Sequence, residues 1–182
     1  MSRIPAVDPS TAQGEAKTLL DGVNSAFGVT PNLFRVAANS SAALNGLVQL
    51  NTALAKGAFR ARLREAIGLT VAQANTCDYC LSAHSAIGRG AGMSDADIAS
   101  AREARASDPK TAAILAFTEK VVRDRAQISD AELTTVKSAG VTNGEIVEIV
   151  ANIALNVFTN YLNIVADTEI DFPVVSSQAA VR

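Results

Sequence analysis

Both cysteines of the 182-residue chain and its only histidine stand close together, in residues 65–84, with a glutamate at the start of that stretch. Thiols beside an imidazole and a carboxylate suit thiol redox chemistry, in which a thiolate is the nucleophile and its neighbours move the proton. Cys77 and Cys80 are close enough in one helical turn to form a disulfide. His84 follows one turn later, and Glu65 is the carboxylate. These four residues are the candidate catalytic group.

The spacing of the cysteines and the histidine predicts that they share one helix face. At about 100° per residue, Cys77, Cys80 and His84 fall within an arc of roughly 60°. Ile87 and Ala91 extend this stripe, which we therefore expect to point toward the core or a pocket. We expect the opposite side of the helix to meet water, and its residues are polar: Asp78, Ser82, Ser85 and Arg89.

The cysteine pair is predicted to lie at the start of its helix, just after a break at residues 75–76. Unpaired N–H groups and the positive end of the helix dipole stabilise a thiolate at such a position. His84 can accept a thiol proton, because an imidazole titrates near neutral pH. A reactive pair is therefore the reading that the pattern favours.

Glu65 belongs to the preceding predicted helix, on a stripe of small and apolar residues that includes Gly68. A carboxylate on such a face is costly to bury without a partner. The short break before the cysteines lets the two helices pack as a hairpin, so we expect Glu65 to approach His84. A surface ion pair with Arg62 or Arg64 is the alternative.

Helical periodicity and capping signals recur along the chain, and no segment shows the alternation of a strand. We therefore predict an all-α fold. The expected helices cover residues 9–27, a short segment opened by Thr30–Pro31, residues 40–57, 60–75 and 77–89, then helices begun by the capping sequences at Ser94, Asp108 and Ser129, and a long last helix from Thr142 to about residue 171.

Composition narrows the functional class. The chain is 48% hydrophobic and 19% charged, with no Trp, which suits packed helices. A net charge of −2 argues against partners held by their negative charge, so we expect no nucleic acid and no membrane. The N-terminus lacks the apolar run of a signal peptide, and residues 146–157 are too short to span a bilayer. We expect a cytoplasmic protein, in which a close cysteine pair is more often reactive than a structural disulfide.

The spacing Glu, eleven residues, Cys-x-x-Cys, three residues, His resembles the active-site signature of the AhpD-like alkylhydroperoxidases, within the carboxymuconolactone decarboxylase superfamily. Glu65, Cys77, Cys80 and His84 match it at every position. Residues 30–34 and 168–173 are similar to segments of the longer "peroxidase-related" members. The resemblance covers most of the chain and implies a single AhpD-like helical domain over residues 1–182, with the cysteines at the helix N-terminus of a hairpin.

The resemblance also implies a function, the reduction of hydroperoxides by the cysteine pair. Cys80 would attack the peroxide, Cys77 would resolve the sulfenic acid as a disulfide, and His84 and Glu65 would form a proton relay. It implies no flavin, haem or metal cofactor. A dithiol, either a lipoylated or a thioredoxin-like protein, would reduce the disulfide, and the chain would assemble as a homotrimer or a hexamer.

One position departs from the family pattern. Tyr79 stands between the cysteines, where some members have a second histidine. A tyrosine can donate a hydrogen bond but cannot act as a base at neutral pH. The relay is therefore expected to be shorter here, and turnover slower.

Other interpretations of the same residues stay open. The cysteines could be inert core residues, or ligands of zinc together with His84 and Glu65. The enzyme could be a decarboxylase of a lactone acid, or the protein a non-catalytic redox sensor or binding module. In the last helix, Phe158 and Tyr161 are expected to be core or subunit contacts. Four asparagines there could serve an interface or a pocket: Asn152, Asn156, Asn160 and Asn163.

Overall fold

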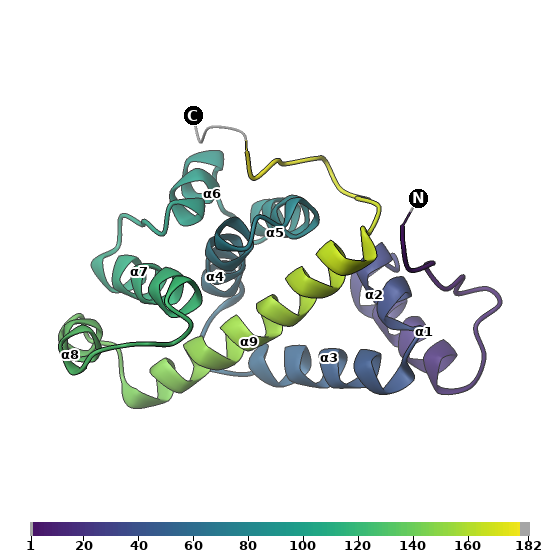
Figure 1. Ribbon diagram of the computed structural model, residues 1–182, viewed down its shortest axis with the longest axis horizontal. Coiled ribbons are helices and arrows are strands. Elements are labelled where there is room, and N and C mark those ends of the chain that lie inside the picture. The colour runs from purple at the N-terminus through teal and green to yellow at the C-terminus, as the bar shows by residue number, and fades with distance from the viewer. Residues whose placement is uncertain (1, 179–182) are drawn as a thin grey trace.

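The computed structural model describes residues 2–178, which form nine α-helices and no strand, as the all-α prediction required (Figure 1). The helices are α1 (Gly14–Phe27), α2 (Asn32–Ala37), α3 (Ser41–Leu54), α4 (Ala61–Ala74), α5 (Asp78–Gly90), α6 (Asp95–Arg102), α7 (Pro109–Arg123), α8 (Asp130–Ser138) and α9 (Asn143–Ala166).

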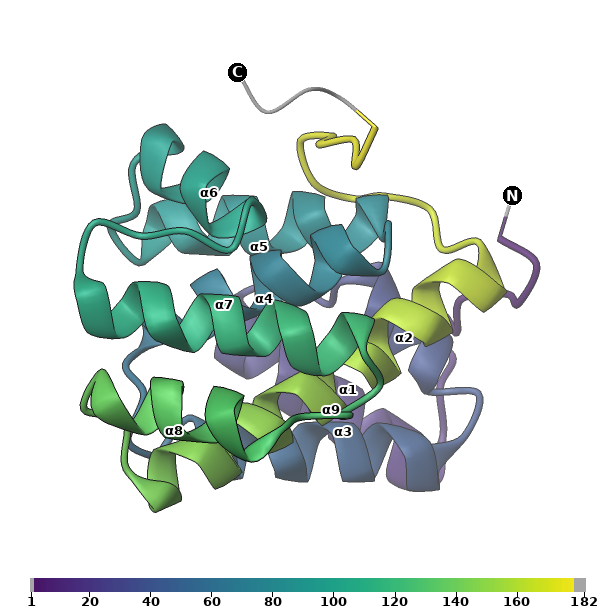
Figure 2. The same ribbon diagram turned by 60° about the vertical axis from the view of Figure 1, so that its left-hand side comes forward.

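Two helices organise the molecule. Helix α4 is the central one: its residues 66–72 are all buried, and it packs against α5, α6, α7 and α9. Helix α9 runs diagonally between α1–α3 on one side and α4–α8 on the other (Figure 1). The turned view shows α6, α7 and α8 on the near side, with α1 and α3 behind (Figure 2). Because α9 packs against α3 as well as α4, it joins the two groups of helices.

The capping signals in the sequence mark helix starts correctly. Ser94, Ser129 and Thr142 each form a full capping box with an acidic residue three positions later. The Asp108 side chain caps α7, and Ser40 caps α3. Each cap satisfies backbone N–H groups that the first turn leaves without partners.

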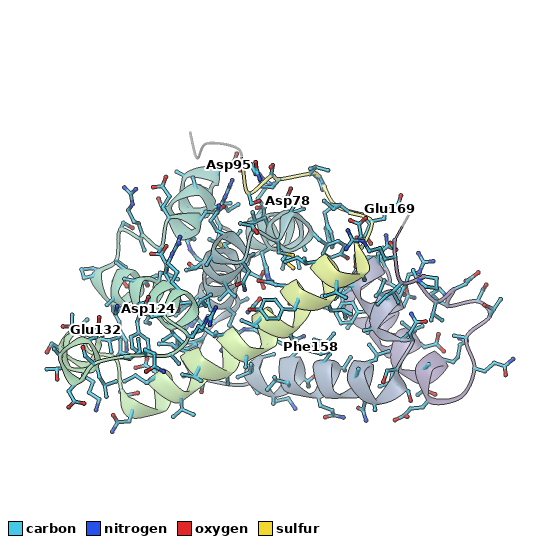
Figure 3. All side chains as sticks on the ribbon, in the orientation of Figure 1. Asp78, Asp95, Asp124, Glu132, Phe158 and Glu169 are labelled. Carbon is cyan, nitrogen blue, oxygen red and sulfur yellow. The ribbon has the colours of Figure 1, made fainter. Side chains whose placement is uncertain are left out.

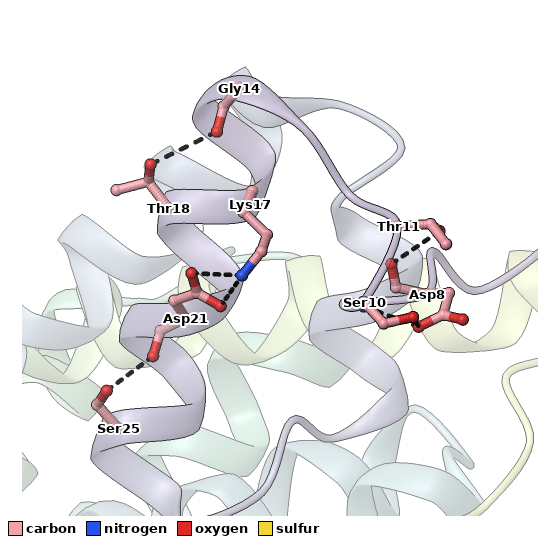
Figure 4. A network of polar contacts seen from close by, with 8 residues as sticks. All are labelled: Asp8, Ser10, Thr11, Gly14, Lys17, Thr18, Asp21 and Ser25. Carbon is pink, nitrogen blue, oxygen red and sulfur yellow. Dashed lines mark hydrogen bonds and ion pairs between the residues drawn. The ribbon is translucent and has the colours of Figure 1, made fainter.

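The first helix begins later than predicted, at Gly14 and not at Pro9. The Asp8 carboxylate accepts hydrogen bonds at 2.8 Å from both the backbone N–H and the hydroxyl of Ser10, and the Asp8 carbonyl accepts one from Thr11 (Figure 4). These bonds close a turn, which competes with the helix. Downstream, Lys17 and Asp21 form an i,i+4 ion pair at 2.6 Å (Figure 4).

The last helix ends earlier than predicted, at Ala166 and not near residue 171. Asp167 adopts a left-handed conformation with φ 51°, and the N–H of Thr168 donates back to the carbonyl of Asn163. This reversal closes the helix and sends residues 167–178 across α5 without regular structure.

The C-terminal segment overturns the prediction that the polar side of α5 meets water. Val175 N–H donates to the Ser82 hydroxyl at 2.9 Å, and Ser177 N–H donates to Asp78 at 2.8 Å. Asp78 therefore lies beneath this segment at the start of α5 (Figure 3). Ser82 and Ser85 are fully buried, whereas Ile87, expected to point inward, is 39% exposed. Helical periodicity could not anticipate a strap from the far end of the chain.

Helix α9 passes the length and composition test for a membrane span, but 44% of its most apolar window is buried inside the protein. It contacts five other helices, as the core helix of a folded domain does. Its buried side carries four asparagines and a threonine beside Ile149, Ile153 and Ala166, and one of these asparagines, Asn163, contacts Cys80.

Candidate functional site

The cysteine pair lies where the sequence places it, at the N-terminus of α5. Cys77 is the N-cap residue, and its Sγ accepts a hydrogen bond at 3.3 Å from the backbone N–H of Cys80. The two sulfur atoms are 2.6 Å apart, and both side chains are buried. Thr76 takes the left-handed conformation, φ 54°, that turns the chain from α4 into α5. The geometry required of a redox pair is present.

Glu65 and His84 meet across the α4–α5 hairpin. Glu65 Oε2 lies 2.7 Å from His84 Nδ1, with the two side chains 14% and 20% exposed. Such a contact fixes the ring orientation and leaves Nε2 free to face elsewhere. Glu65 forms no ion pair with Arg62 or Arg64 among the described residues, and Arg62 pairs instead with Asp97 at 2.9 Å.

Gly68 provides the surface on which the imidazole lies. A Cβ atom at this position would stand 2.5–2.7 Å from three ring atoms of His84, namely Cε1, Nδ1 and Nε2. No side chain fits between the ring and the α4 backbone. Gly68 is one turn beyond Glu65 on the same stripe, so α4 supplies both the hydrogen-bond partner and the contact surface of His84.

The asparagines of α9 form the wall opposite the cysteines. All four are buried, with 5% exposure or less. Asn163 Nδ2 donates to Cys80 Sγ at 3.3 Å, and Asn75 Nδ2 donates to Asn160 Oδ1 at 2.9 Å. Asn156 and Asn163 line the cavity that reaches Cys80. Of the two roles left open by the sequence, the structure places these two residues in the pocket.

The two thiols have opposite proton affinities. The hydrogen bond from Cys80 lowers the pKa of Cys77, outweighing burial, and the nearby imidazole of His84 acts in the same direction. Burial raises the pKa of Cys80, and the thiol hydrogen bond to Cys77 adds to the effect, while the amides of Asn163 and Asn160 oppose it. Of the two thiols, Cys77 therefore releases its proton more readily than Cys80.

The pKa of His84 is raised above that of a free imidazole. Burial alone would lower the pKa of the imidazole, but the charge and hydrogen bond of Glu65 outweigh it, with help from the Asn156 amide and the Cys77 sulfur. The net direction is upward. An imidazolium beside a thiolate is the state in which a reactive thiol and a proton donor coexist.

Tyr79 is a structural anchor at the rim of the site. Its hydroxyl accepts a hydrogen bond at 3.0 Å from the N–H of Leu33, and its ring packs edge-on against Phe172 at 5.8 Å. Burial raises the pKa of the phenol, so it stays neutral. Asn32 N–H also donates to Asp171 at 2.8 Å. The two flanking segments that the resemblance singled out therefore meet each other at Tyr79.

A cavity of about 510 Å³ leads to the site and reaches Cys80 but not Cys77. Its wall is mostly apolar, with side chains from α1 to α5, α9 and the C-terminal segment. Polar side chains in the lining include those of Arg64, Glu65, His84, Asn156 and Asn163. Of the two thiols, Cys80 is the one that this cavity reaches.

The zinc interpretation finds no matching ligand set: within residues 2–178, no three His, Cys, Asp or Glu side chains are arranged to hold a metal ion. Glu65 instead hydrogen-bonds the imidazole with which it would have shared the metal.

Sequence reasoning missed the role of Gly68 and left open whether the α9 asparagines serve a pocket or an interface. The repeated asparagines at helical spacing, in a helix with no charged residue between Glu148 and Asp167, were the available signal. Polar residues on one stripe of an apolar helix indicate a polar site when the stripe is buried, and only the packing shows that it is.

Comparison with known proteins agrees with the geometry. Residues 41–121, which include all four candidate catalytic residues, match the model of the Carboxymuconolactone decarboxylase family. No protein of curated function matches the chain significantly.

Solved structures share the fold at low identity. A peroxidase-related protein from Ralstonia eutropha JMP134, described as having an alkylhydroperoxidase AhpD core, superposes with a TM-score of 0.84 at 22% identity, covering 93% of this chain and 92% of its own. A peroxidase-related protein from Silicibacter sp. TM1040 gives 0.78 at 22% identity over 91% and 88%. The debrominase Bmp8, crystallised with 2,3,4-tribromopyrrole, gives 0.78 at 21% over 92% and 91%.

Proposed function

We propose that this chain, which has the AhpD-like helical fold and whose residues 41–121 match the Carboxymuconolactone decarboxylase family, reduces organic hydroperoxides through Cys80 and Cys77. One observation carries the proposal: two thiols in contact at a helix N-terminus, with a Glu65–His84 pair beside them and a cavity that opens onto Cys80. No metal or prosthetic group enters the proposed chemistry.

We propose a starting state with a thiolate on Cys77, a proton on Cys80 and a second proton on His84, in line with the lowered pKa of Cys77 and the raised pKa values of Cys80 and His84. When a hydroperoxide enters, Cys80 passes its proton to Cys77 across the 2.6 Å contact and becomes the thiolate. Asn163 Nδ2 stabilises this charge by donating to Cys80 Sγ. Cys77 therefore acts as the first base, and the imidazolium is kept for the leaving group.

Oxygen transfer follows. The Cys80 thiolate attacks the terminal oxygen of R–O–OH: an S–O bond forms, the O–O bond breaks, and the alkoxide leaves as ROH with the proton of His84. The buried Nδ2 of Asn160 and Oδ1 of Asn163 have no hydrogen-bond partner, so they are available to the sulfenic hydroxyl. Glu65 supports the charged imidazole until it gives up its proton.

Disulfide formation closes the half-reaction. Cys77 sulfur attacks Cys80 sulfur: the S–S bond forms, the S–O bond breaks, and the hydroxide leaves as water with the Cys77 proton. A dithiol protein, lipoylated or thioredoxin-like, then returns two electrons and two protons by exchange. We propose the cytoplasm as the compartment, because its reducing environment restores the thiols.

Stopped-flow measurement of cumene hydroperoxide consumption with a dithiol donor tests the proposal. Wild-type protein should show turnover, and Cys80→Ser should consume peroxide only at the uncatalysed rate. Cys77→Ser should complete one oxidation and then stop at the sulfenic acid, which dimedone traps.

Ser85→Ala is a suitable control, since its buried hydroxyl lies on α5 outside the cavity. Equal peroxide consumption by wild type and Cys80→Ser would refute the assignment. Decarboxylation of a lactone acid that survives alkylation of both thiols would instead favour a decarboxylase, which needs a proton donor but no thiol. Reversible oxidation without turnover would indicate a sensor.

We further propose that the chain assembles with copies of itself, as a homotrimer or a hexamer, through α9. The outer side of this helix presents six large apolar residues that are 39–68% exposed: Val147, Val150, Phe158, Tyr161, Ile164 and Val165. Phe158 projects from the middle of the helix (Figure 3). A contiguous apolar stripe of this length, without a charged residue, is typical of a subunit contact.

Sedimentation velocity measures the assembly. Wild-type protein at micromolar concentration should sediment as a trimer or larger, and Tyr161→Glu should shift it toward the monomer by placing a charge in the stripe. Lys137→Glu on exposed α8 is the control and should leave the assembly unchanged. A wild-type monomer would rule the proposal out.

A further inference from the structure

Arg64 is a positively charged residue in the cysteine cavity that the proposed chemistry does not use. It lies in the first turn of α4 and lines the same cavity as Cys80. Its Nε is buried and has no hydrogen-bond partner in the part of the chain that the structure describes. The arginines that form ion pairs among residues 2–178 are others: Arg62, Arg89, Arg105 and Arg123.

The position of Arg64 follows from the helix. Ala61, Arg64, Glu65 and Gly68 fall on one stripe of α4, and this stripe faces the cavity and His84. Arg62, two residues earlier, turns to the opposite side and pairs with Asp97 beside a second cavity. Of these two arginines, only Arg64 lines the cavity that reaches Cys80.

The charge balance of the cavity leaves the guanidinium uncompensated. The only carboxylate in the lining is that of Glu65, which is engaged with His84. The remaining walls are largely apolar, with Phe27, Val29 and Leu33 among them. A cation with a buried, unpartnered donor in apolar surroundings is costly, and an anionic ligand relieves that cost.

Cavity size and lining describe the rest of the ligand. About 510 Å³ falls in the range of cavities that bury drug-sized molecules, and it far exceeds the need of hydrogen peroxide. Apolar side chains at the mouth include Ile87, which is 39% exposed, and Val29, which is 61% exposed. Such walls favour an alkyl chain or a ring.

We propose that Arg64 binds the carboxylate of an apolar acid, and that the substrate is an organic hydroperoxide which carries such a carboxylate. The claim that this acid is a substrate rests on the proposed peroxidase function. The claim that Arg64 binds an apolar carboxylate does not. Arg64 is then a specificity residue: it holds one end of the molecule while the peroxide end reaches Cys80. The planar guanidinium can bind both carboxylate oxygens through two parallel N–H donors, a fixed geometry that the single nitrogen of a lysine does not offer.

Calorimetry with unreactive probes tests the binding, using decanoate and decan-1-ol. Wild-type protein should bind decanoate at least about tenfold more tightly than decanol, the gain typical of a charge-assisted hydrogen bond. Arg64→Gln should abolish that preference while keeping decanol affinity, and Arg64→Lys should restore part of it. Arg60→Gln removes a charge from the exposed start of α4 beside the second cavity, so it should change nothing.

Turnover then separates the two proposals, with linoleic acid hydroperoxide compared to its methyl ester. If the acid is the better substrate by about tenfold in kcat/KM and Arg64→Gln removes the difference, both proposals stand. Equal affinities of the wild type for decanoate and decanol, or a preference that Arg64→Gln retains, overturns the role of Arg64, whatever the peroxidase activity. Selective decanoate binding without peroxide consumption leaves the anion site intact and refutes the peroxidase function.

Discussion

The α4–α5 hairpin and helix α9 both contribute polar side chains to one site, but they do so in different ways. In the hairpin, Glu65, Cys77, Cys80 and His84 lie within a short stretch of chain, and a turn with a left-handed Thr76 brings them together. In α9, Asn163 reaches Cys80 across 83 positions of sequence. The hairpin carries the reacting and titrating groups, and α9 supplies neutral hydrogen-bond donors.

Helix α9 also differs from an ordinary amphipathic helix. It buries four asparagines together with Ile149 and Ile153 and leaves large apolar residues such as Val147 and Tyr161 exposed, whereas α7 buries mainly apolar residues such as Ile114 and Leu115. Buried amides are costly unless they are paired, so their presence indicates a use for them. The difference predicts that changes in the hairpin stop the chemistry, whereas changes in α9 alter its rate.

Glu65→Gln should have the largest effect among the hairpin variants that keep both thiols. Without the carboxylate, the pKa of His84 falls, so the imidazolium loses its proton at a lower pH. The alkaline limb of the kcat/KM profile therefore shifts to lower pH. With less positive charge on His84, the pKa of Cys77 also rises, and the acid limb of the profile shifts to higher pH. We expect a narrower profile with a maximum reduced about a hundredfold or more.

The measurement is the pH dependence of peroxide reduction for wild type and Glu65→Gln, with Glu119→Gln as the control, because that carboxylate pairs with Arg123 on α7. A profile of unchanged width would show that Glu65 does not act through His84.

Gly68→Ala should follow, with kcat/KM reduced by tens of fold, up to about a hundredfold, since a displacement of about 1 Å in a catalytic group can cost that much. The added Cβ would stand within 2.7 Å of three His84 ring atoms, so the ring must move away from Glu65. Steady-state kinetics of the variant measure the loss of kcat/KM, and its imidazole NMR signals report the displacement of the His84 ring.

Gly46→Ala is the matched control, because this glycine lies in α3 with nothing within 4 Å of the added atom. It should gain slightly in thermal stability and keep full activity. Normal activity and an unshifted imidazole in Gly68→Ala would show that the ring has room elsewhere.

Asn163→Leu should have the smallest effect of the three, about a tenfold slower attack on peroxide, from the loss of one hydrogen bond to the thiolate. Asn152→Leu is the control, since its amide donates to Glu148 within α9. The rate of Cys80 alkylation by iodoacetamide in a Cys77→Ser background measures the change. If both leucine variants react alike, α9 is only a wall of the cavity.

Most of the hairpin was predictable from the sequence. Its groups are close in sequence and on helix faces, so periodicity alone predicted that Cys77 and Cys80 would be adjacent and that Glu65 would approach His84. Local signals also located helix starts well, because caps such as Ser94 and Thr142 act within one turn. Helix ends were less predictable: a turn at Asp8 delayed α1, and a reversal at Asp167 ended α9.

The sequence by itself determined the all-helical class and the four-residue group, because these depend on helical periodicity and on the short break between two neighbouring helices. Only the tertiary structure decided that Asn163 contacts the sulfur of Cys80, that His84 lies on Gly68, that the Arg64 Nε is buried without a partner among residues 2–178, and that the C-terminal segment covers Ser82. These contacts join segments far apart in the chain. Their formation depends on how whole helices pack, which no local pattern records.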